Sequence, residues 1–312
     1  MEARSAVLLF LAAVVLVIFI DASLLRQGWT GLNYNCDCSR LVRVDANDQD
    51  LYNFTCPVCP QQQQQQNGQP VQQPSDGTSG ADQAAIKPEE TNALRGAFSF
   101  IYSSAAWGRN KDGKGHSGAG STKEATDNFR LQLEDFLRQK DIKSVVDAGC
   151  GDWEWTQFVD WGPVEQYTGV DVVPSVIARN QELHAAHNRT FHARSILEKD
   201  NLPPADLLMS KDVLQHLPTP MVHQFVANHL TAHDGRYKYK YALMTNDRCN
   251  VTTLHRKCVD NRDLGKPGGW REVNLALPPF CLPAFEFYRW PNHWWGDNER
   301  EKVTLLMDFT RA

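Results

Sequence analysis

Residues 145–155, which read VVDAGCGDWEW, decide the fold of this 312-residue chain. A short apolar run ends in Asp147, and Gly149 and Gly151 follow before a polar turn. A strand, a glycine turn and a helix in this order bring backbone N–H groups close to a ligand at the helix N-terminus. Glycine is needed there because a Cβ would block the approach or the required φ. Glycines also serve ordinary turns, so this stretch alone does not distinguish a ligand-binding turn from an ordinary one.

The next extended run, 166–171, again ends in a carboxylate, that of Asp171. In an open α/β sheet, an acidic residue at the end of the second strand is placed to accept hydrogen bonds from ribose hydroxyls. Glu154 occupies the position of the third glycine of a dinucleotide fingerprint, which disfavours NAD. The pattern therefore indicates a nucleoside without a pyrophosphate.

Three motifs now stand in order: DAGCGD (147–152), GVD (169–171) and ADLLMSKDVLQHL (205–217). They resemble the successive motifs of class I S-adenosylmethionine-dependent methyltransferases, and the resemblance covers about residues 95–312. It implies an α/β, Rossmann-like fold with a mostly parallel seven-stranded sheet, an antiparallel edge strand and helices on both faces. It also implies an enzyme that uses S-adenosyl-L-methionine as methyl donor.

The apolar pattern of residues 143–310 predicts strands that alternate with helices, which is typical of a parallel sheet covered on both faces. A capping box at Ser121 and Glu124 precedes a helix with a core-facing stripe formed by Phe129, Leu133, Phe136 and Leu137. Two final strands, 285–290 and 303–310, form an antiparallel hairpin. The other expected strands are 143–147, 166–171, 190–193, 206–210 and 239–246, and the other expected helices are 152–161, 174–187 and 218–233.

The N-terminal residues 6–20 are uninterrupted apolar. This run fits a signal-peptide core, and continuing past Asp21 to Leu25 gives the length of a membrane helix. We expect 1–25 to be a signal anchor, with a lumenal catalytic domain on a Golgi or other secretory-pathway membrane; a secreted protein is the alternative. Three N-glycosylation sequons fit a lumenal location without establishing it, at Asn53, Asn188 and Asn250.

Residues 26–59 hold four cysteines, spaced for either disulfides or a zinc site. Residues 60–90 are rich in glutamine and cannot build a core, so they predict a flexible stalk before a methyltransferase domain at 91–312. Anchor, stalk and catalytic domain are the layout of Golgi-resident glycan-modifying enzymes, which is an analogy of architecture. The net charge of -5 gives no case for nucleic-acid binding. The four cysteines are Cys36, Cys38, Cys56 and Cys59.

By the resemblance, Asp147 and the glycine turn hold the methionine end of the donor, Asp171 holds the ribose, and residues 194–197 approach adenine. Ser195 stands where many members of the family carry an acidic residue. Trp153 either contacts the donor or packs against the sheet. The predicted donor-binding residues are Asp147, Gly149, Gly151, Asp152, Trp153, Asp171, Ser195, Ile196 and Lys211.

The glycine-rich loop 108–120 is either a linker or a lid over the donor. In the second case the candidate lid residues are Trp107, Ser117, Gly120 and Ser121.

On the acceptor side, a helical turn after the fourth strand would place Asp212 and His216 on one face. A hydroxyl acceptor must lose its proton during the attack, and either side chain is a candidate base. A packing or capping role is the alternative for both, and Asp247 is the reserve candidate. The spacing predicts no bound metal.

A long insertion follows the fifth strand and is expected to be functional. Cys249 and Cys258 can staple it, and Trp270, Arg271 and Asn274 combine an apolar face with donors that suit a sugar. A surface loop is the alternative. These features predict methylation of a hydroxyl on a glycan or glycoprotein; the alternatives are a small molecule or lipid head group as acceptor, or a nucleoside-binding domain without turnover.

Overall fold

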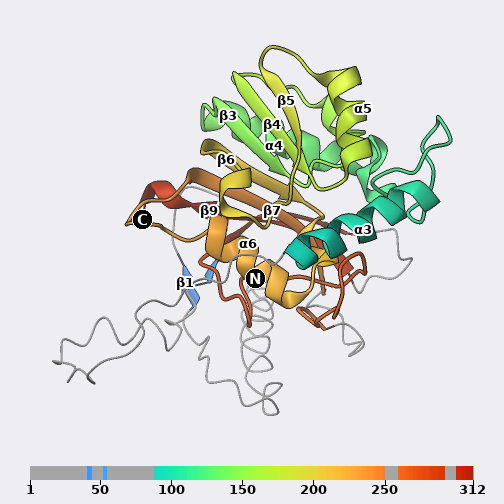
Figure 1. The fold of residues 1–312 in the computed structure, drawn as a ribbon. Coiled ribbons are helices and arrows are strands. Elements are labelled where there is room, and N and C mark those ends of the chain that lie inside the picture. The colour runs from blue at the N-terminus through green and yellow to red at the C-terminus, as the bar shows by residue number, and fades with distance from the viewer. Residues whose placement is uncertain (1–40, 44–51, 55–87, 250–258, 292–299, 312) are drawn as a thin grey trace, which may run out of the picture. The chain divides into compact units, whose positions relative to one another are not determined.

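The structure is a computed structural model that describes residues 41–43, 52–54, 88–249, 259–291 and 300–311 (Figure 1). All of these ranges belong to one unit of the chain, Cys38–Ala312. Among the described residues, no helix is long and apolar enough to cross a membrane. Several predictions fall outside the described residues: the anchor at 1–25, most of the stalk at 60–90, the site at Cys36, Cys38, Cys56 and Cys59, the sequon at Asn250, and Cys258.

Seven strands form the central sheet in the order β5-β4-β3-β6-β7-β9-β8. Neighbouring strands from β5 to β7 are parallel, whereas β9 is antiparallel to both β7 and β8. The expected fold is confirmed, with the antiparallel strand one place in from the edge. The strands are β3 (Ser144–Ala148), β4 (Gln166–Asp171), β5 (Arg189–Ala193), β6 (Ala205–Lys211), β7 (Tyr239–Cys249), β8 (Phe285–Pro291) and β9 (Arg300–Asp308). A separate antiparallel pair consists of β1 (Leu41–Arg43) and β2 (Tyr52–Phe54).

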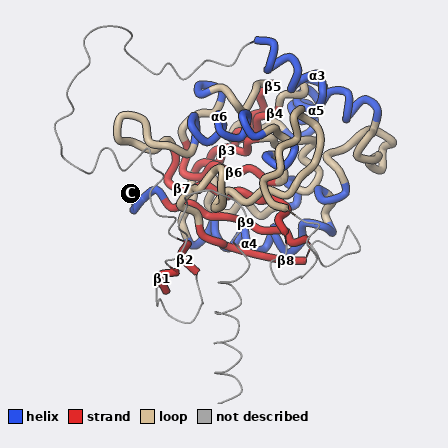
Figure 2. Tube along the Cα trace, turned by 90° about the horizontal axis from the view of Figure 1, so that it is seen from below, coloured by secondary structure: helices blue, strands red, loops and turns tan. Residues whose placement is uncertain are grey.

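Four α-helices are described, and they cover both faces of the sheet (Figure 2). Successive strand residues point to opposite faces, so Val145 packs with the apolar stripe of α4 while Val146 packs with Val222 and Phe225 of α6. The helices are α3 (Pro88–Ser104), α4 (Asp127–Gln139), α5 (Pro174–His184) and α6 (Thr219–His229). Short 3-10 turns are Ala119–Ser121, Glu124–Thr126, Thr156–Phe158, Lys199–Asn201, Leu214–His216 and Phe309–Arg311.

Two local predictions are wrong. The helix expected at 152–161 is a 3-10 turn, Thr156–Phe158, because Trp153 adopts a left-handed backbone with φ 60° and turns its indole into the core. The capping box at Ser121 does not form, since α4 begins at Asp127 and Thr122 Oγ1 instead accepts a bond from the Ala125 N–H. The buried stripe of α4 is as expected.

The chain passes from β3 outward to β4 and β5, then returns to the other side of β3 for β6 and β7. In open α/β sheets, ligands bind beyond the carboxyl ends of the strands at such a reversal. The fold therefore directs attention to the segments that follow Ala148, Asp171 and Lys211.

Candidate active site

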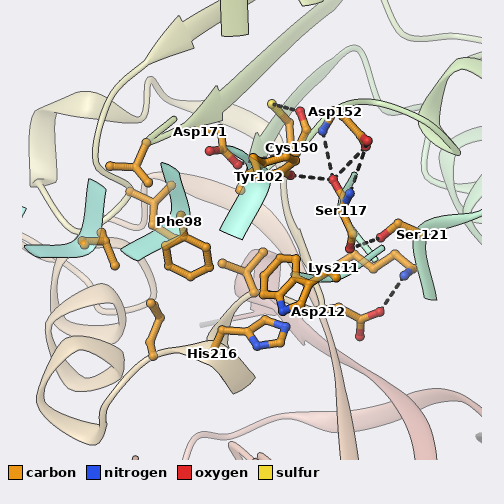
Figure 3. A pocket seen from close by; sticks show the side chains of 18 of the residues that line it. Phe98, Tyr102, Ser117, Ser121, Cys150, Asp152, Asp171, Lys211, Asp212 and His216 are labelled. Carbon is orange, nitrogen blue, oxygen red and sulfur yellow. Dashed lines mark hydrogen bonds and ion pairs between the residues drawn. The ribbon is translucent and has the colours of Figure 1, made fainter. Parts of the chain in front are cut away.

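A cavity of about 710 Å³, open mouth included, lies at the carboxyl ends of β3, β4 and β6. Its walls come from the glycine turn after β3, from Asp171 at the end of β4 and from the turn after β6 that carries Asp212 and His216. One face of α3 closes it with Leu94, Phe98 and Tyr102. Figure 3 shows Asp171 and Cys150 on one side and Asp212 and His216 on the other, with Phe98 between them.

The glycine turn leaves no space for side chains. Gly149 has φ 83°, and a Cβ there would lie 2.5 Å from Cγ2 of Val213. Gly151 has φ 56°, and a Cβ there would lie 2.3 Å from Oγ of Ser117. Both positions therefore need glycine for the conformation and for the close approach of neighbouring segments.

Asp171 is fixed by the turn beside it. The Gly151 N–H donates to its Oδ2 at 3.1 Å, and the Val173 N–H donates to its Oδ1 at 3.0 Å. Burial raises the pKa of Asp171 to about 6, against the lowering effect of these backbone bonds. Each carboxylate oxygen has two lone pairs, so the group keeps capacity to accept bonds from ligand hydroxyls in the cavity.

Asp147 lies beneath the turn and outside the cavity wall. It accepts a 2.7 Å bond from the hydroxyl of Tyr167, which in turn accepts a 2.9 Å bond from Nε1 of Trp153. Burial raises the pKa of Asp147 to about 7. Trp153 is 2% exposed and packs against Tyr167 and Phe191, so the structure supports the packing interpretation of Trp153 rather than donor contact.

The segment after β5 presents Ile196 to the cavity, whereas Ser195 is buried behind it. The Ser195 hydroxyl oxygen accepts a bond from the Leu197 N–H at 3.3 Å, so the side chain is used within the segment and a donor contact of Ser195 through its backbone stays a prediction. His229 of α6 holds the segment from below, since its Nε2 donates to the Ile196 carbonyl at 2.8 Å.

The loop that precedes α4 is bonded to the glycine turn (Figure 3). The Ser117 hydroxyl donates to Oδ1 of Asp152 at 2.7 Å and accepts from the Asp152 N–H at 3.0 Å. Because its proton is used on Asp152, the 2.6 Å bond to Tyr102 must have the Tyr102 hydroxyl as donor. His116 adds a second link, with its ring nitrogens at 3.1 Å from Oε2 of Glu154 and from the Trp107 carbonyl oxygen.

Of the four candidate lid residues, Trp107, Ser117 and Ser121 line the cavity. Gly120 contributes through its carbonyl oxygen, which accepts a 3.0 Å bond from Nζ of Lys211. The loop is thus part of the cavity wall, held to the strand ends by polar contacts.

Four buried charges form a lysine–aspartate network beside the cavity: Lys211, Asp212, Lys302 and Asp247. Asp212 is bonded through Oδ2 to Lys211 at 2.6 Å and through Oδ1 to Lys302 at 2.8 Å, and Lys302 also reaches Oδ1 of Asp247 at 2.9 Å. Burial opposes ionisation of Asp212, but the two lysines outweigh it and lower its pKa to about 2. Trp270 Nε1 donates to the other oxygen of Asp247 at 3.0 Å.

His216 lines the cavity opposite Asp171 and lies against the Trp107 indole, with ring centroids 4.7 Å apart. Its Nδ1 is 2.6 Å from the carbonyl oxygen of Gly269. A carbonyl only accepts, so Nδ1 carries the proton. Burial lowers the pKa of His216, which favours the neutral ring.

The predicted acceptor residues of the insertion lie away from the cavity. Arg271 is fully buried and donates to the carbonyls of Leu217 and Arg262, so its predicted contact with a sugar is wrong. Asn274 accepts a 3.1 Å bond from the Ala276 N–H and shapes the insertion, and it does not line the cavity. Trp270 is directed to Asp247 as described and does not line the cavity.

Sequence reasoning missed Leu94 and Phe98, although Leu94, Phe98 and Tyr102 recur at helical spacing and so predict one face of a helix. It also missed Lys302. A lysine in the apolar strand Arg300–Asp308 was the available signal, since a buried charge requires a partner.

Among the described residues, no group of three or more His, Cys, Asp or Glu side chains is placed to hold a metal ion. Cys150 is a buried free thiol, and Cys249 is disulfide-bonded.

Comparison with protein-family models gave no match, and comparison with curated proteins gave none. Among solved structures, the chain is similar to the methyltransferase domain of bacterial CtHen1 (14% identity, TM-score 0.40, covering 58% of this chain and 99% of that one). It is also similar to the N-methyltransferase NodS from Bradyrhizobium japonicum in complex with S-adenosyl-L-homocysteine (16%, 0.38, 59% and 88%). A third is TehB from Haemophilus influenzae (14%, 0.40, 60% and 66%). These likenesses are too distant to assign a reaction or an acceptor.

Proposed function

We propose that the protein is an S-adenosylmethionine-dependent methyltransferase. The observation that carries the proposal is the pairing of a side-chain-free glycine turn with the Asp171 carboxylate at the same cavity wall. The backbone of the turn lines the cavity, and the carboxylate beside it is placed to accept bonds from two vicinal hydroxyls. The motif resemblance, observed sheet order and position of the cavity at the topological reversal agree with it.

The residues present suit such a donor. Asp171 would hold the ribose hydroxyls, and Val172 and Ile196 give apolar walls for a purine beside it. Tyr102 and Ser117 close the cavity over the glycine turn and exclude water from the reacting centre. The donor supplies an electrophilic methyl group on a sulfonium, and the protein supplies orientation and a dry site.

Calorimetry with S-adenosylhomocysteine on the full chain in detergent tests the donor site. Asp171→Asn keeps the volume and one acceptor but loses the charge, so we expect the affinity to fall about 10- to 100-fold, which is about 1.4–2.8 kcal/mol. The matched control is Asp200→Asn at an exposed aspartate in the turn Lys199–Asn201, which should leave the affinity unchanged. Absence of heat with the wild-type chain, or equal affinities for wild type and Asp171→Asn, would refute the proposal.

We further propose that the acceptor is a glycan hydroxyl in the secretory pathway, with the chain anchored by residues 1–25. Support comes from the apolar run 6–20, the glutamine-rich stretch that follows it and the sequons. Trp107 and Trp155 in the cavity wall offer aromatic faces of the kind that Trp270 was expected to provide.

Transfer from methyl-labelled donor distinguishes the acceptors. Label in glycans released from membrane glycoproteins supports the proposal. Label confined to the lipid extract or to small molecules would favour the alternative acceptors. Donor binding without transfer to any of them would favour a nucleoside-binding domain without turnover.

A further inference from the structure

Three side chains near the cavity are chemically able to take a proton from an acceptor: Asp212, Asp247 and His216. The contacts of each decide which is able to act. A base needs a free lone pair and a pKa that leaves it unprotonated and yet able to hold a proton during the reaction.

Asp212 fails on both counts. Each carboxylate oxygen faces a lysine ammonium, at 2.6 Å for Lys211 and 2.8 Å for Lys302. Its pKa of about 2 makes it a weak proton acceptor at neutral pH. Its role is to hold the two lysines together at the end of β6.

Asp247 is excluded by its position. It is 2% exposed and does not line the cavity. One oxygen is bonded to Lys302 and the other to the Trp270 indole. Asp247 therefore ties β7 to β9 and to the insertion.

His216 lies in the cavity wall, and its ring is fixed from two sides. The Gly269 carbonyl accepts a hydrogen bond from the Nδ1–H, and Trp107 lies against the ring. In a neutral imidazole with Nδ1 protonated, Nε2 carries the lone pair. The backbone of His216 is also fixed: its N–H donates to the Val213 carbonyl at 3.0 Å, and its carbonyl accepts from the Gly268 N–H at 2.9 Å.

Three charged groups act on His216 from three elements: Asp212 after β6, Asp247 on β7 and Lys302 on β9. The two carboxylates raise the pKa of the ring and the lysine lowers it. Burial is then the largest influence on the ring and keeps it neutral at neutral pH. The lysine–aspartate network of two lysines and two aspartates carries no net formal charge, so it gives no electrostatic reason to favour a charged acceptor.

We propose that His216 is the general base for a neutral hydroxyl acceptor, oriented by the Gly269 carbonyl of the insertion. This inference rests on the methyl-transfer function proposed above. The acceptor oxygen forms a bond to the methyl carbon while the carbon–sulfur bond breaks and its electron pair stays on sulfur. The hydroxyl proton passes to Nε2, and the imidazolium releases it to solvent.

Ring-nitrogen NMR on the full chain, labelled at histidine and bound to S-adenosylhomocysteine in detergent micelles, tests the assignment without an acceptor. His216→Asn identifies the signals. We expect a proton on Nδ1 and none on Nε2 at neutral pH, and a midpoint of titration below that of an ordinary histidine. The proposal is overturned if Nε2 is protonated and Nδ1 is not, or if the midpoint of titration lies above that of an ordinary histidine.

Methyl transfer to a panel of methyl pyranosides and amino sugars is the second arm. His216→Asn should lower the rate by about 100- to 10,000-fold and leave S-adenosylhomocysteine affinity unchanged. The matched control is His223→Asn, at an exposed histidine on α6 beside Phe280, which should change neither.

The rate of the wild type should fall at acidic pH as Nε2 becomes protonated. Wild-type rates in His216→Asn, or transfer to amino groups alone, contradict the proposal while leaving the donor site intact. Absence of S-adenosylhomocysteine binding would instead remove the function on which it rests.

Discussion

Asp171 and Asp212 are partly buried aspartates on opposite sides of one cavity, and their surroundings differ in kind. Asp171 at the end of β4 receives backbone N–H bonds, and burial raises its pKa to about 6. Asp212 after β6 receives two lysine ammonium groups, which lower its pKa to about 2. The carboxylate of Asp171 can still accept hydrogen bonds from a ligand, whereas both oxygens of Asp212 are bonded to lysines of the protein.

The comparison teaches that residue type does not assign the role. Asp171 is the last residue of β4, Asp212 directly follows β6, and both line the cavity, so the sequence presents them alike. What separates them is Lys302, which comes from β9 and lies 90 residues from Asp212 along the chain. Changes at Asp171 should therefore alter donor affinity and its dependence on pH. Loss of a charge partner of Asp212 should instead alter the stability of the protein.

The largest effect is expected from Lys302→Met, which breaks the network. It removes the ammonium group that Asp212 and Asp247 share, and we expect the free energy of unfolding to fall by about 3–5 kcal/mol in urea titrations. Lys240→Met is the matched control, because Lys240 pairs with Asp206 at an exposed site and should cost less than about 1 kcal/mol. Equal effects of the two would contradict a structural role for the network.

Gly149→Ala tests the packing of the glycine turn against the β6 side. The new Cβ would lie 2.5 Å from Val213, so overpacking adds about 1–3 kcal/mol to the cost of a left-handed alanine. Gly235→Ala is the control: φ there is 73°, and among the described residues no atom lies within 4 Å of the added Cβ. Thermal and urea unfolding should show the larger loss for Gly149→Ala; similar losses would mean that the turn is not closely packed.

Asp147→Asn sharpens the contrast in pH response. The pKa of Asp147 is about 7 in the folded protein and about 3.9 when unfolded. The folded state thus holds the extra proton, and the stability that this group contributes below pH 4 is lost as the pH rises to about 7. The variant should therefore gain stability relative to the wild type by at most about 1.4 kcal/mol per pH unit in this window. A constant difference from pH 5 to 7 in urea titrations would show that Asp147 does not carry this response.

The smallest effect expected is in donor affinity. Protonation of Asp171 below pH 6 removes the acceptor for ribose hydroxyls, so the dissociation constant of S-adenosylhomocysteine should rise by at most about tenfold per pH unit as the pH falls. Asp171→Asn should abolish this dependence in calorimetry. An unchanged slope in the variant would place the titrating group elsewhere.

The sequence predicted the fold because its signals are local, and the strand Gln166–Asp171 has the predicted bounds. Gly149, Gly151 and Asp171 line the cavity, and their contact with the donor stays a prediction. The sequence did not reveal that Asp147 and Trp153 are buried and do not line the cavity. A residue at a strand end points to one face or the other, and the hydroxyl of Tyr167 on the adjacent strand β4 accounts for the buried position of Asp147.

By itself, the sequence determined the alternation of strands and helices, the glycine turn and the carboxylate that closes β4, because periodicity and backbone freedom act over a few residues. Only the tertiary structure decided which polar side chains remain available. Lys302 neutralises Asp212, and Gly269 fixes the tautomer of His216, across 90 and 53 positions of the chain respectively. Strand order and the docking of loops decide which residues form such pairs. The ionisation of a buried carboxylate and the tautomer of a histidine then depend on these tertiary partners.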